Sequence, residues 1–362
     1  MTADTYRTKV LGSLLGGAIG DALGAPVEFW SRDQITSTVG HGGVRDYLET
    51  TFGEERGLGL ITDDTQMTLF TMEGLIAAYE RSQARGIGFT MQLVHESYLR
   101  WYQTQVTTEP VITDHSWLAG EQWLYSRRAP GDTCLSALRI VKEDPAPRPA
   151  LLAERAPNNS KGCGSVMRAA PFGWIPCNER DLDQWIIPSA LQVAGFTHGH
   201  PTAQIAAAAL AVIVRELIFG AEIEDAVITA QHKIEWIPES HETTDALQQA
   251  LHLAEDDHGN IDSLNSLGEG WIAEQALAIA VYCAASFPRE DHLLEALSLS
   301  VSHSGDSDST GAICGNILGA RHGIHALPTQ LIEDLEGLPT LTRMGEQFVD
   351  TFTGMYRSTS RT

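Results

Sequence analysis

Residues 303–320 read "HSGDSDSTGAICGNILGA", with Asp306 and Asp308 one residue apart and Ser309 directly after them. The small and apolar residues that follow are typical of a buried helix. Carboxylates and hydroxyls at a helix N-terminus accept hydrogen bonds from its free N–H groups and interact favourably with the helix dipole. Capping alone explains one such side chain at the start of a helix, but not a group of them.

A second cluster lies far upstream in "LITDDTQMTLF", where Thr62, Asp63 and Asp64 precede a helical pattern that starts near Met67. Clustered carboxylates raise one another's pKa unless a cation lies between them. Hard oxygen ligands from two distant segments favour Mg²⁺ or Mn²⁺ and suit a site with two metal ions. The two clusters therefore indicate either two heavily capped helices or one dinuclear metal site.

A glycine-rich segment, "SKGCGSVMRAAPFG", lies between the clusters at 160–173. Gly162, Gly164 and Ser165 offer backbone freedom and N–H groups that can cradle a diphosphate. A tight turn before a core helix explains the same pattern equally well.

Two histidines stand in "FTHGHPTA" (196–203), at His198 and His200. Their i,i+2 spacing, with no third soft ligand nearby, gives a zinc site little support.

The elements that must position these residues are predicted to be helices. Alternating strand-like runs with hairpin turns are scarce, so we predict an all-α fold, a compact single-domain helical bundle over residues 1–362. Polar segments at 40–60 and 105–132 are predicted loops, and "KEDPAPRPA" at 142–150 is predicted to be an extended link within the bundle. Helical periodicity is clearest in four windows: 67–80, 203–219, 271–286 and 311–320.

Glycine and alanine recur in "LGSLLGGAIGDALGA" (11–25) and in "GAICGNILGA" (311–320). Each interior glycine costs a helix roughly 1 kcal/mol, which is tolerated where backbones approach closely. We therefore predict two tightly crossed core helices. Asp21 interrupts the first run, so we do not interpret it as a signal peptide, and no other stretch approaches the roughly 18 apolar residues of a membrane span.

The formal net charge of −23 argues against a nucleic-acid docking surface, since such surfaces rely on Lys and Arg to neutralise phosphates. An anionic ligand would instead need a local positive centre, such as a bound divalent ion. The five cysteines are odd in number and widely spaced, which favours reduced thiols in the cytoplasm. We expect a cytoplasmic protein whose partners include neither nucleic acid nor membrane.

Taken together, six motifs in this order resemble the ADP-ribosylglycohydrolase family, which includes the dinitrogenase-reductase-activating glycohydrolases. The resemblance runs from about residue 8 to 323, and it implies an all-α fold with two Mg²⁺ or Mn²⁺ ions. It also implies hydrolysis of the glycosidic bond between ADP-ribose and an acceptor, most often a protein side chain. The motifs are "GSLLGGAIGDALGAPVEF", "TDDTQMTLF", "GCGSVMRAAPFG", "THGHPTA", "LGEGWIAEQALAIA" and "HSGDSDSTGAICGNILGA".

The resemblance also assigns metal ligands, with Asp308 bridging the two ions and Ser309 standing where many members carry Thr. Glu28, in "PVEF", matches a mobile acidic residue near the metals. We predict Glu28 as the acid and base of the reaction and Asp308 as the second catalytic residue. The matched metal ligands are Thr62, Asp63 and Asp64 for one ion and Asp306 and Ser309 for the other, with Asp308 between them.

The ADP-ribose half is matched by a loop that wraps the diphosphate and the proximal ribose, at Gly162, Cys163, Gly164, Ser165 and Met167. His198 matches a histidine that faces the ligand, whereas we expect a structural role for His200. Asp132 lies in "RRAPGDTC", a segment that also resembles the family, but the resemblance assigns it no role.

The function implied is removal of mono-ADP-ribose from a modified protein, with free ADP-ribose as the product, and arginine is our favoured acceptor. Serine-, polymer- and nucleobase-linked ADP-ribose are alternative substrates. A non-catalytic relative that binds ADP-ribose or a toxin, and a two-metal hydrolase of phosphate esters, are alternatives of other classes.

Overall fold

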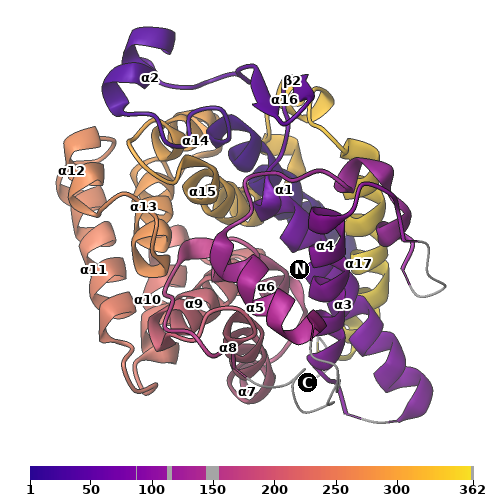
Figure 1. Cartoon of the computed structure of the whole chain (residues 1–362). Coiled ribbons are helices and arrows are strands. Elements are labelled where there is room, and N and C mark those ends of the chain that lie inside the picture. Colours follow the sequence, from indigo (N-terminus) through magenta and orange to yellow (C-terminus); the bar gives the residue numbers. More distant parts are fainter. Residues whose placement is uncertain (87, 112–115, 144–154, 360–362) are drawn as a thin grey trace.

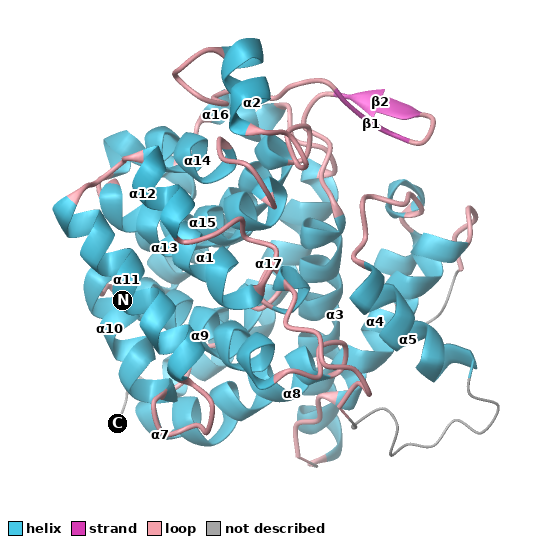
Figure 2. Ribbon diagram, turned by 60° about the vertical axis from the view of Figure 1, so that its left-hand side comes forward, coloured by secondary structure: helices cyan, strands magenta, loops and turns pink. Residues whose placement is uncertain are grey.

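The computed structural model describes residues 1–86, 88–111, 116–143 and 155–359 (Figure 1). From residue 144 onward, the predicted extended link at 142–150 lies outside this part of the chain. The described residues are helical apart from turns, loops and one antiparallel hairpin, in which Thr50 pairs with Gly57 (Figure 2). The predicted all-α fold is confirmed.

The helices are α1 (Ala3–Gly24), α2 (Arg32–Val39), α3 (Asp63–Arg85), α4 (Gln92–Val106), α5 (Asp132–Glu143), α6 (Ala170–Trp174), α7 (Glu179–Asp181), α8 (Ile187–Gly195), α9 (Pro201–Ile218), α10 (Ile223–Ile234), α11 (His241–Asp256), α12 (Ile261–Ser266), α13 (Ala273–Ser286), α14 (Leu293–Val301), α15 (Ser307–His322), α16 (Thr329–Glu333) and α17 (Leu338–Thr359). The strands are β1 (Thr50–Phe52) and β2 (Glu55–Gly57). The four periodic windows correspond to α3, α9, α13 and α15.

Helices α1 and α15 lie side by side and antiparallel at the centre of the molecule (Figure 1). A Cβ atom on Gly16 would clash with the carbonyl oxygen of Gly315, and one on Gly20 would clash with that of Gly311. The predicted close packing of these two glycine-rich helices is confirmed. As a result, the C-terminal end of α1 meets the N-terminal end of α15, which carries Asp308.

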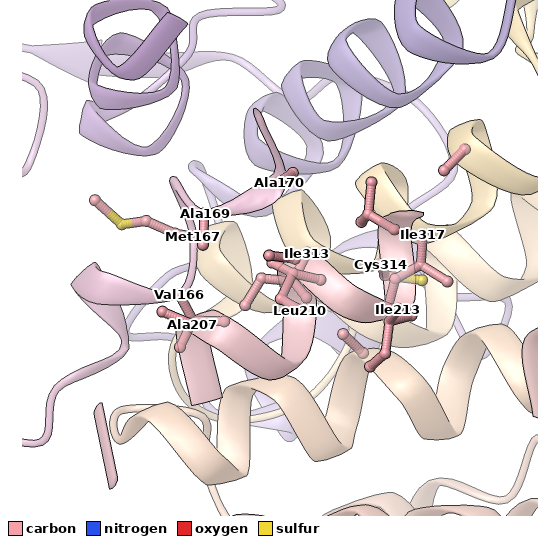
Figure 3. Close-up of a cluster of buried hydrophobic side chains, with 14 of the residues drawn as sticks. Val166, Met167, Ala169, Ala170, Ala207, Leu210, Ile213, Ile313, Cys314 and Ile317 are labelled. Atoms are coloured by element: carbon pink, nitrogen blue, oxygen red, sulfur yellow. The ribbon is translucent and has the colours of Figure 1, made fainter. Parts of the chain in front are cut away.

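Helix α9 is a core helix, although its 18 residues have a mean hydropathy of 1.5 and are long and apolar enough to cross a membrane. This corrects the expectation that no such stretch exists beyond the N-terminal run. Of the residues of this helix, 89% are buried inside the protein. Leu210 and Ile213 pack beside Ile313 and Ile317 of α15 (Figure 3). Most of the buried apolar side chains of the described residues form one connected cluster.

The two predicted loops hold more structure than the sequence indicated. Segment 40–60 contains the hairpin, which turns at Gly53 with a φ of 61°. Segment 105–132 contains two short 3₁₀ turns, Leu118–Gly120 and Gln122–Leu124. The hairpin strands are only three residues long and lack an alternating pattern, so no periodicity revealed them.

Candidate functional site

Asp21 of α1 fixes the start of α3, a role that sequence reasoning missed. Its carboxylate accepts hydrogen bonds from the N–H of Thr62 at 2.9 Å, the N–H of Thr65 at 3.1 Å and the hydroxyl of Thr65 at 2.5 Å. Burial and the nearby charge of Asp308 raise the pKa of Asp21 to about 7, and these hydrogen bonds oppose the rise. Asp21 therefore positions the start of α3, which carries the cluster of Thr62, Asp63 and Asp64.

A buried ion-pair network supports the same helix start from its other side. The Arg128 guanidinium donates to Glu336 at 2.7 and 3.0 Å, to Glu55 at 2.6 Å and to the carbonyl oxygen of Ile61 at 3.3 Å. The carbonyl oxygen of Arg128 accepts from the N–H of Asp63 at 3.0 Å. The segment that carries the first acidic cluster is thus held by groups from α1, the hairpin and the turn just before α17.

The second cluster caps α15. The N–H of Ser309 donates to Asp308 at 3.0 Å and to Asp306 at 3.3 Å. The N–H of Asp306 donates to the carbonyl oxygen of Glu269 at 2.9 Å. A glycine is required at Gly305, because its φ is 128° and a Cβ atom there would clash with Glu269.

The fold brings the two clusters into one cavity of about 330 Å³. Six carboxylates line it, and none of the described lining residues is a lysine or an arginine. Thr62 is fully buried beside the cavity, and its hydroxyl lies 3.4 Å from the Asp64 carboxylate. The lining carboxylates are Glu28, Asp63, Asp64, Asp132, Asp306 and Asp308.

The carboxylates strongly perturb one another. Burial first, and then repulsion from Asp308, raises the pKa of Asp63, Asp64 and Asp306 well above the usual range. The same two causes raise the pKa of Glu28 to about 10.

This cluster fits a cation. Oδ1 of Asp64 is buried and accepts no hydrogen bond from any described residue. In the part of the chain that is described, no three acidic, histidine or cysteine side chains converge closely enough to enclose an ion on their own. A hard divalent ion would neutralise the repulsion and use the free acceptor, so the donor set fits Mg²⁺ or Mn²⁺.

The glycine-rich loop forms the neighbouring wall of the cavity. The N–H of Cys163 donates to the carbonyl oxygen of Trp271 at 3.2 Å, and the Cys163 thiol donates to Asp306 at 2.7 Å. Gly162, Gly164 and Met167, which the resemblance assigns to ADP-ribose binding, also line the cavity. Ser165 does not line it, because its hydroxyl donates to the carbonyl oxygen of Ala203 at 2.9 Å.

His198 faces the cavity from beneath this loop. Arg168, fully buried, donates to the Thr197 hydroxyl at 2.5 Å, and that hydroxyl lies 2.8 Å from Nδ1 of His198. The hydroxyl also lies 3.5 Å from the carbonyl oxygen of Ala194, and donation to the nearer acceptor, Nδ1, would place the ring hydrogen of His198 on Nε2. Burial and the charge of Arg168 lower the pKa of His198 to about 3, so the ring is a neutral donor.

The space around this imidazole is kept open by glycine, since a Cβ atom on Gly162 would lie 3.3 Å from Nε2 of His198. His200 takes no part in the cavity. Its Nδ1 accepts from the N–H of Thr202 at 3.2 Å and caps α9.

Several lining residues were not assigned a role from the sequence. Phe29 and Trp271 stack at the rim with ring centroids 5.2 Å apart and planes at 23°. Asp132 and Thr133 approach from the start of α5. Their positions in the sequence could have indicated such a role, because Phe29 directly follows Glu28 and Trp271 lies inside the motif "LGEGWIAEQALAIA".

A helical scaffold thus carries buried, paired carboxylates beside a glycine-rich loop. The model of the ADP-ribosylglycohydrolase family matches residues 2–358. The chain therefore belongs to the ADP-ribosylglycohydrolase family, as the ordered motifs implied. It is accordingly a hydrolase that acts on ADP-ribosyl linkages.

Two named relatives cover most of the chain. A protein of Rhodospirillum rubrum named ADP-ribosyl-[dinitrogen reductase] glycohydrolase is 24% identical and aligns over 93% of both chains. The ADP-ribosylarginine hydrolase Tri1 of Pseudomonas putida (strain GB-1) is 22% identical over 97% of this chain and 80% of its own. A solved structure titled "ADP-ribosylglycohydrolase-related protein complex" has a TM-score of 0.65, with 24% identity over 97% of this chain and 99% of its own, which shows a shared fold.

Proposed function

We propose that this protein removes ADP-ribose from modified arginine side chains of proteins in a reaction that depends on Mg²⁺ or Mn²⁺. The observation that carries the proposal is the convergence of six carboxylates beside a glycine loop and a neutral histidine donor. The arginine acceptor is supported by the printed name of the Pseudomonas putida relative. The cytoplasmic location that we propose agrees with five cysteines that are all free.

Two divalent ions would supply Lewis-acid polarisation and neutralise the carboxylate charge when bound. The residues proposed to hold them lie at the starts of α3 and α15, two helices that Asp21 and the α1–α15 contact bring together. They are Thr62, Asp63 and Asp64 on one side and Asp306, Asp308 and Ser309 on the other.

Glu28 is the proposed acid and base. Burial, the largest cause of the raised pKa of Glu28, favours a protonated carboxyl, and this proton passes to the arginine nitrogen as the bond from that nitrogen to the anomeric carbon breaks. Water then forms the new bond to the anomeric carbon and returns a proton to Glu28. Asp308 stabilises the positive charge that develops on the sugar ring.

The diphosphate of the ADP-ribose is bound at some distance from the anomeric carbon at which the bond breaks. We propose that the backbone of Gly162–Gly164 approaches the diphosphate closely, and that Nε2–H of His198 donates to a phosphoryl oxygen. Positioning of this kind fixes the anomeric carbon beside Glu28 and lowers the entropic part of the barrier.

The test is product analysis with an arginine-ADP-ribosylated protein and Mn²⁺. We expect free ADP-ribose, loss of turnover after exhaustive EDTA treatment and dialysis, and recovery when Mn²⁺ is returned. Release of inorganic phosphate or AMP would instead support a phosphate-ester hydrolase. Tight ADP-ribose binding with no turnover on any linkage would indicate a binding protein.

A further inference from the structure

Two aromatic rings stand at the open rim of the catalytic cavity. Phe29 is 71% exposed and Trp271 is 36% exposed, yet both line the same cavity as the carboxylates. An ADP-ribosylated acceptor belongs to another protein and must enter from solvent, whereas the ADP-ribose half reaches the inner loop. Groups at the rim therefore face the acceptor.

We propose that Phe29 and Trp271 form a platform that binds the guanidinium group of an ADP-ribosylated arginine and selects this acceptor over serine. This inference rests on the proposed function and adds the residues that decide the acceptor. It concerns the rim alone and is separate from the metal ligands.

The backbone of Phe29 adopts a strained conformation that costs conformational free energy. Its φ is 69°, in the left-handed region that non-glycine residues seldom adopt, at a cost of order 1 kcal/mol. The turn is closed by a hydrogen bond from the N–H of Trp30 to the carbonyl oxygen of Val27 at 2.9 Å, and Ser31 then caps α2. This turn lets the consecutive side chains of Glu28 and Phe29 face one cavity, whereas an extended chain would send them to opposite sides.

Trp271 is anchored on the opposite side of the rim. Its carbonyl oxygen accepts from the N–H of Cys163, which ties it to the glycine loop. Gly270, just before it, has a φ of 84° and no room for a side chain against Thr310. The backbone of Trp271 is therefore fixed, and its indole stacks against the Phe29 ring while much of the Phe29 surface stays exposed.

The chemistry of this rim suits a planar cation. Guanidinium groups stack on aromatic faces and gain from cation–π attraction. Even with two divalent ions bound, six carboxylates and a doubly charged diphosphate leave an excess of negative charge around the leaving group. A neutral serine oxygen gains from neither feature.

The experiment compares kcat/KM for one peptide that carries ADP-ribose on either arginine or serine. The variants are Phe29→Leu, which keeps apolar volume but removes the π face, Phe29→Tyr, which keeps both, and Trp271→Leu. Trp236→Leu is the matched control, because Trp236 is 64% exposed and lies between α10 and α11, away from the cavity lining. The affinity for free ADP-ribose, from calorimetry, is measured on every variant.

We expect Phe29→Leu and Trp271→Leu to lower the arginine-to-serine ratio of kcat/KM about five- to tenfold, as cation–π energies predict. Phe29→Tyr should restore the ratio, and Trp236→Leu should leave it unchanged. An equal loss on both linkages, or a parallel loss of ADP-ribose affinity, would overturn the platform while leaving the hydrolase intact. Wild-type turnover of serine alone would overturn both the platform and the arginine acceptor of the proposed function, and no release from either peptide would overturn the proposed function as a whole.

Discussion

At the residue scale, His198 presents one defined ring nitrogen to the cavity. Donation from the Thr197 hydroxyl to Nδ1 would place the hydrogen on Nε2, and burial, together with the charge of Arg168, lowers the pKa of the imidazole and keeps it neutral. A fixed neutral donor binds a phosphoryl oxygen without adding a charge that the acidic cavity would have to accommodate.

Replacing Thr197 by valine should disturb this arrangement. Thr197→Val keeps the shape but leaves Nδ1 of His198 without its donor, so the ring can place its hydrogen on either nitrogen. We expect the affinity for ADP-ribose to fall about five- to tenfold, the equivalent of one hydrogen bond of about 1–1.5 kcal/mol. Calorimetry measures the affinity, and ¹⁵N chemical shifts of the imidazole report the tautomer.

The matched control is Thr197→Ser, which keeps the hydroxyl and should keep both the tautomer and the affinity. An unchanged tautomer in Thr197→Val would show that Thr197 does not set the ring hydrogen.

At the element scale, the start of α3 depends on a salt bridge between residues 208 positions apart in the chain, Arg128 and Glu336. Arg128→Met would leave Glu336 without the guanidinium that offsets its burial. We expect a loss of about 3–5 kcal/mol in the free energy of unfolding, measured with urea.

Arg127→Met is the control for that change, because Arg127 is the exposed neighbour in the chain and should shift the unfolding free energy by less than about 0.5 kcal/mol. Equal effects at the two positions would show that the buried network does not stabilise the fold.

The close contact between α1 and α15 predicts that an added side chain there lowers the stability of the fold. Gly16→Ala would push a methyl group against the carbonyl oxygen of Gly315, so we expect destabilisation by about 1–3 kcal/mol. Gly354→Ala, in α17, has open space around the added Cβ and should stabilise by about 0.5–1 kcal/mol through helix propensity. Thermal unfolding of both variants measures the difference, and a Gly16→Ala protein as stable as wild type would contradict the close approach.

These contacts show what the sequence could and could not predict. The acidic clusters were visible because capping residues and helical periodicity are local, and the paired glycines indicated a close approach of two helices. The role of Asp21 was not visible, because its partner Thr62 lies 41 residues away, and neither was the ion pair of Arg128 with Glu336. Such roles depend on which helix ends the fold brings together.

At the scale of the whole molecule, the carboxylate cavity links stability to pH. Glu28 has a folded-state pKa of about 10, whereas an unfolded glutamate has one near 4, so between these values the folded protein holds a proton that the unfolded chain has lost. The contribution of the Glu28 proton to the free energy of unfolding therefore stabilises the fold at low pH and is lost as the pH rises toward 10. The lowered pKa of His198 acts in the opposite direction, but only below about pH 6.5.

We therefore expect the Tm of the protein in EDTA to fall between pH 7 and 9, with Glu28 alone contributing at most the equivalent of about 1.4 kcal/mol per pH unit. The value is an upper limit, since Glu28 is only partly buried. Mn²⁺ should reduce the slope, because a cation lowers the pKa of nearby carboxyls. Scanning calorimetry of wild type and Glu28→Gln tests this, and the same slope in both proteins would contradict it.

We propose that the acidic starts of α3 and α15 form one metal-dependent hydrolytic centre. ADP-ribose release from arginine-modified protein in the presence of Mn²⁺ tests this directly. Wild type is compared with Asp306→Asn/Asp308→Asn and with Asp225→Asn/Asp262→Asn, a control at exposed first-turn aspartates of α10 and α12. We predict at least about a hundredfold loss of turnover in the first double variant and none in the control. Equal turnover in all three proteins would contradict the claim.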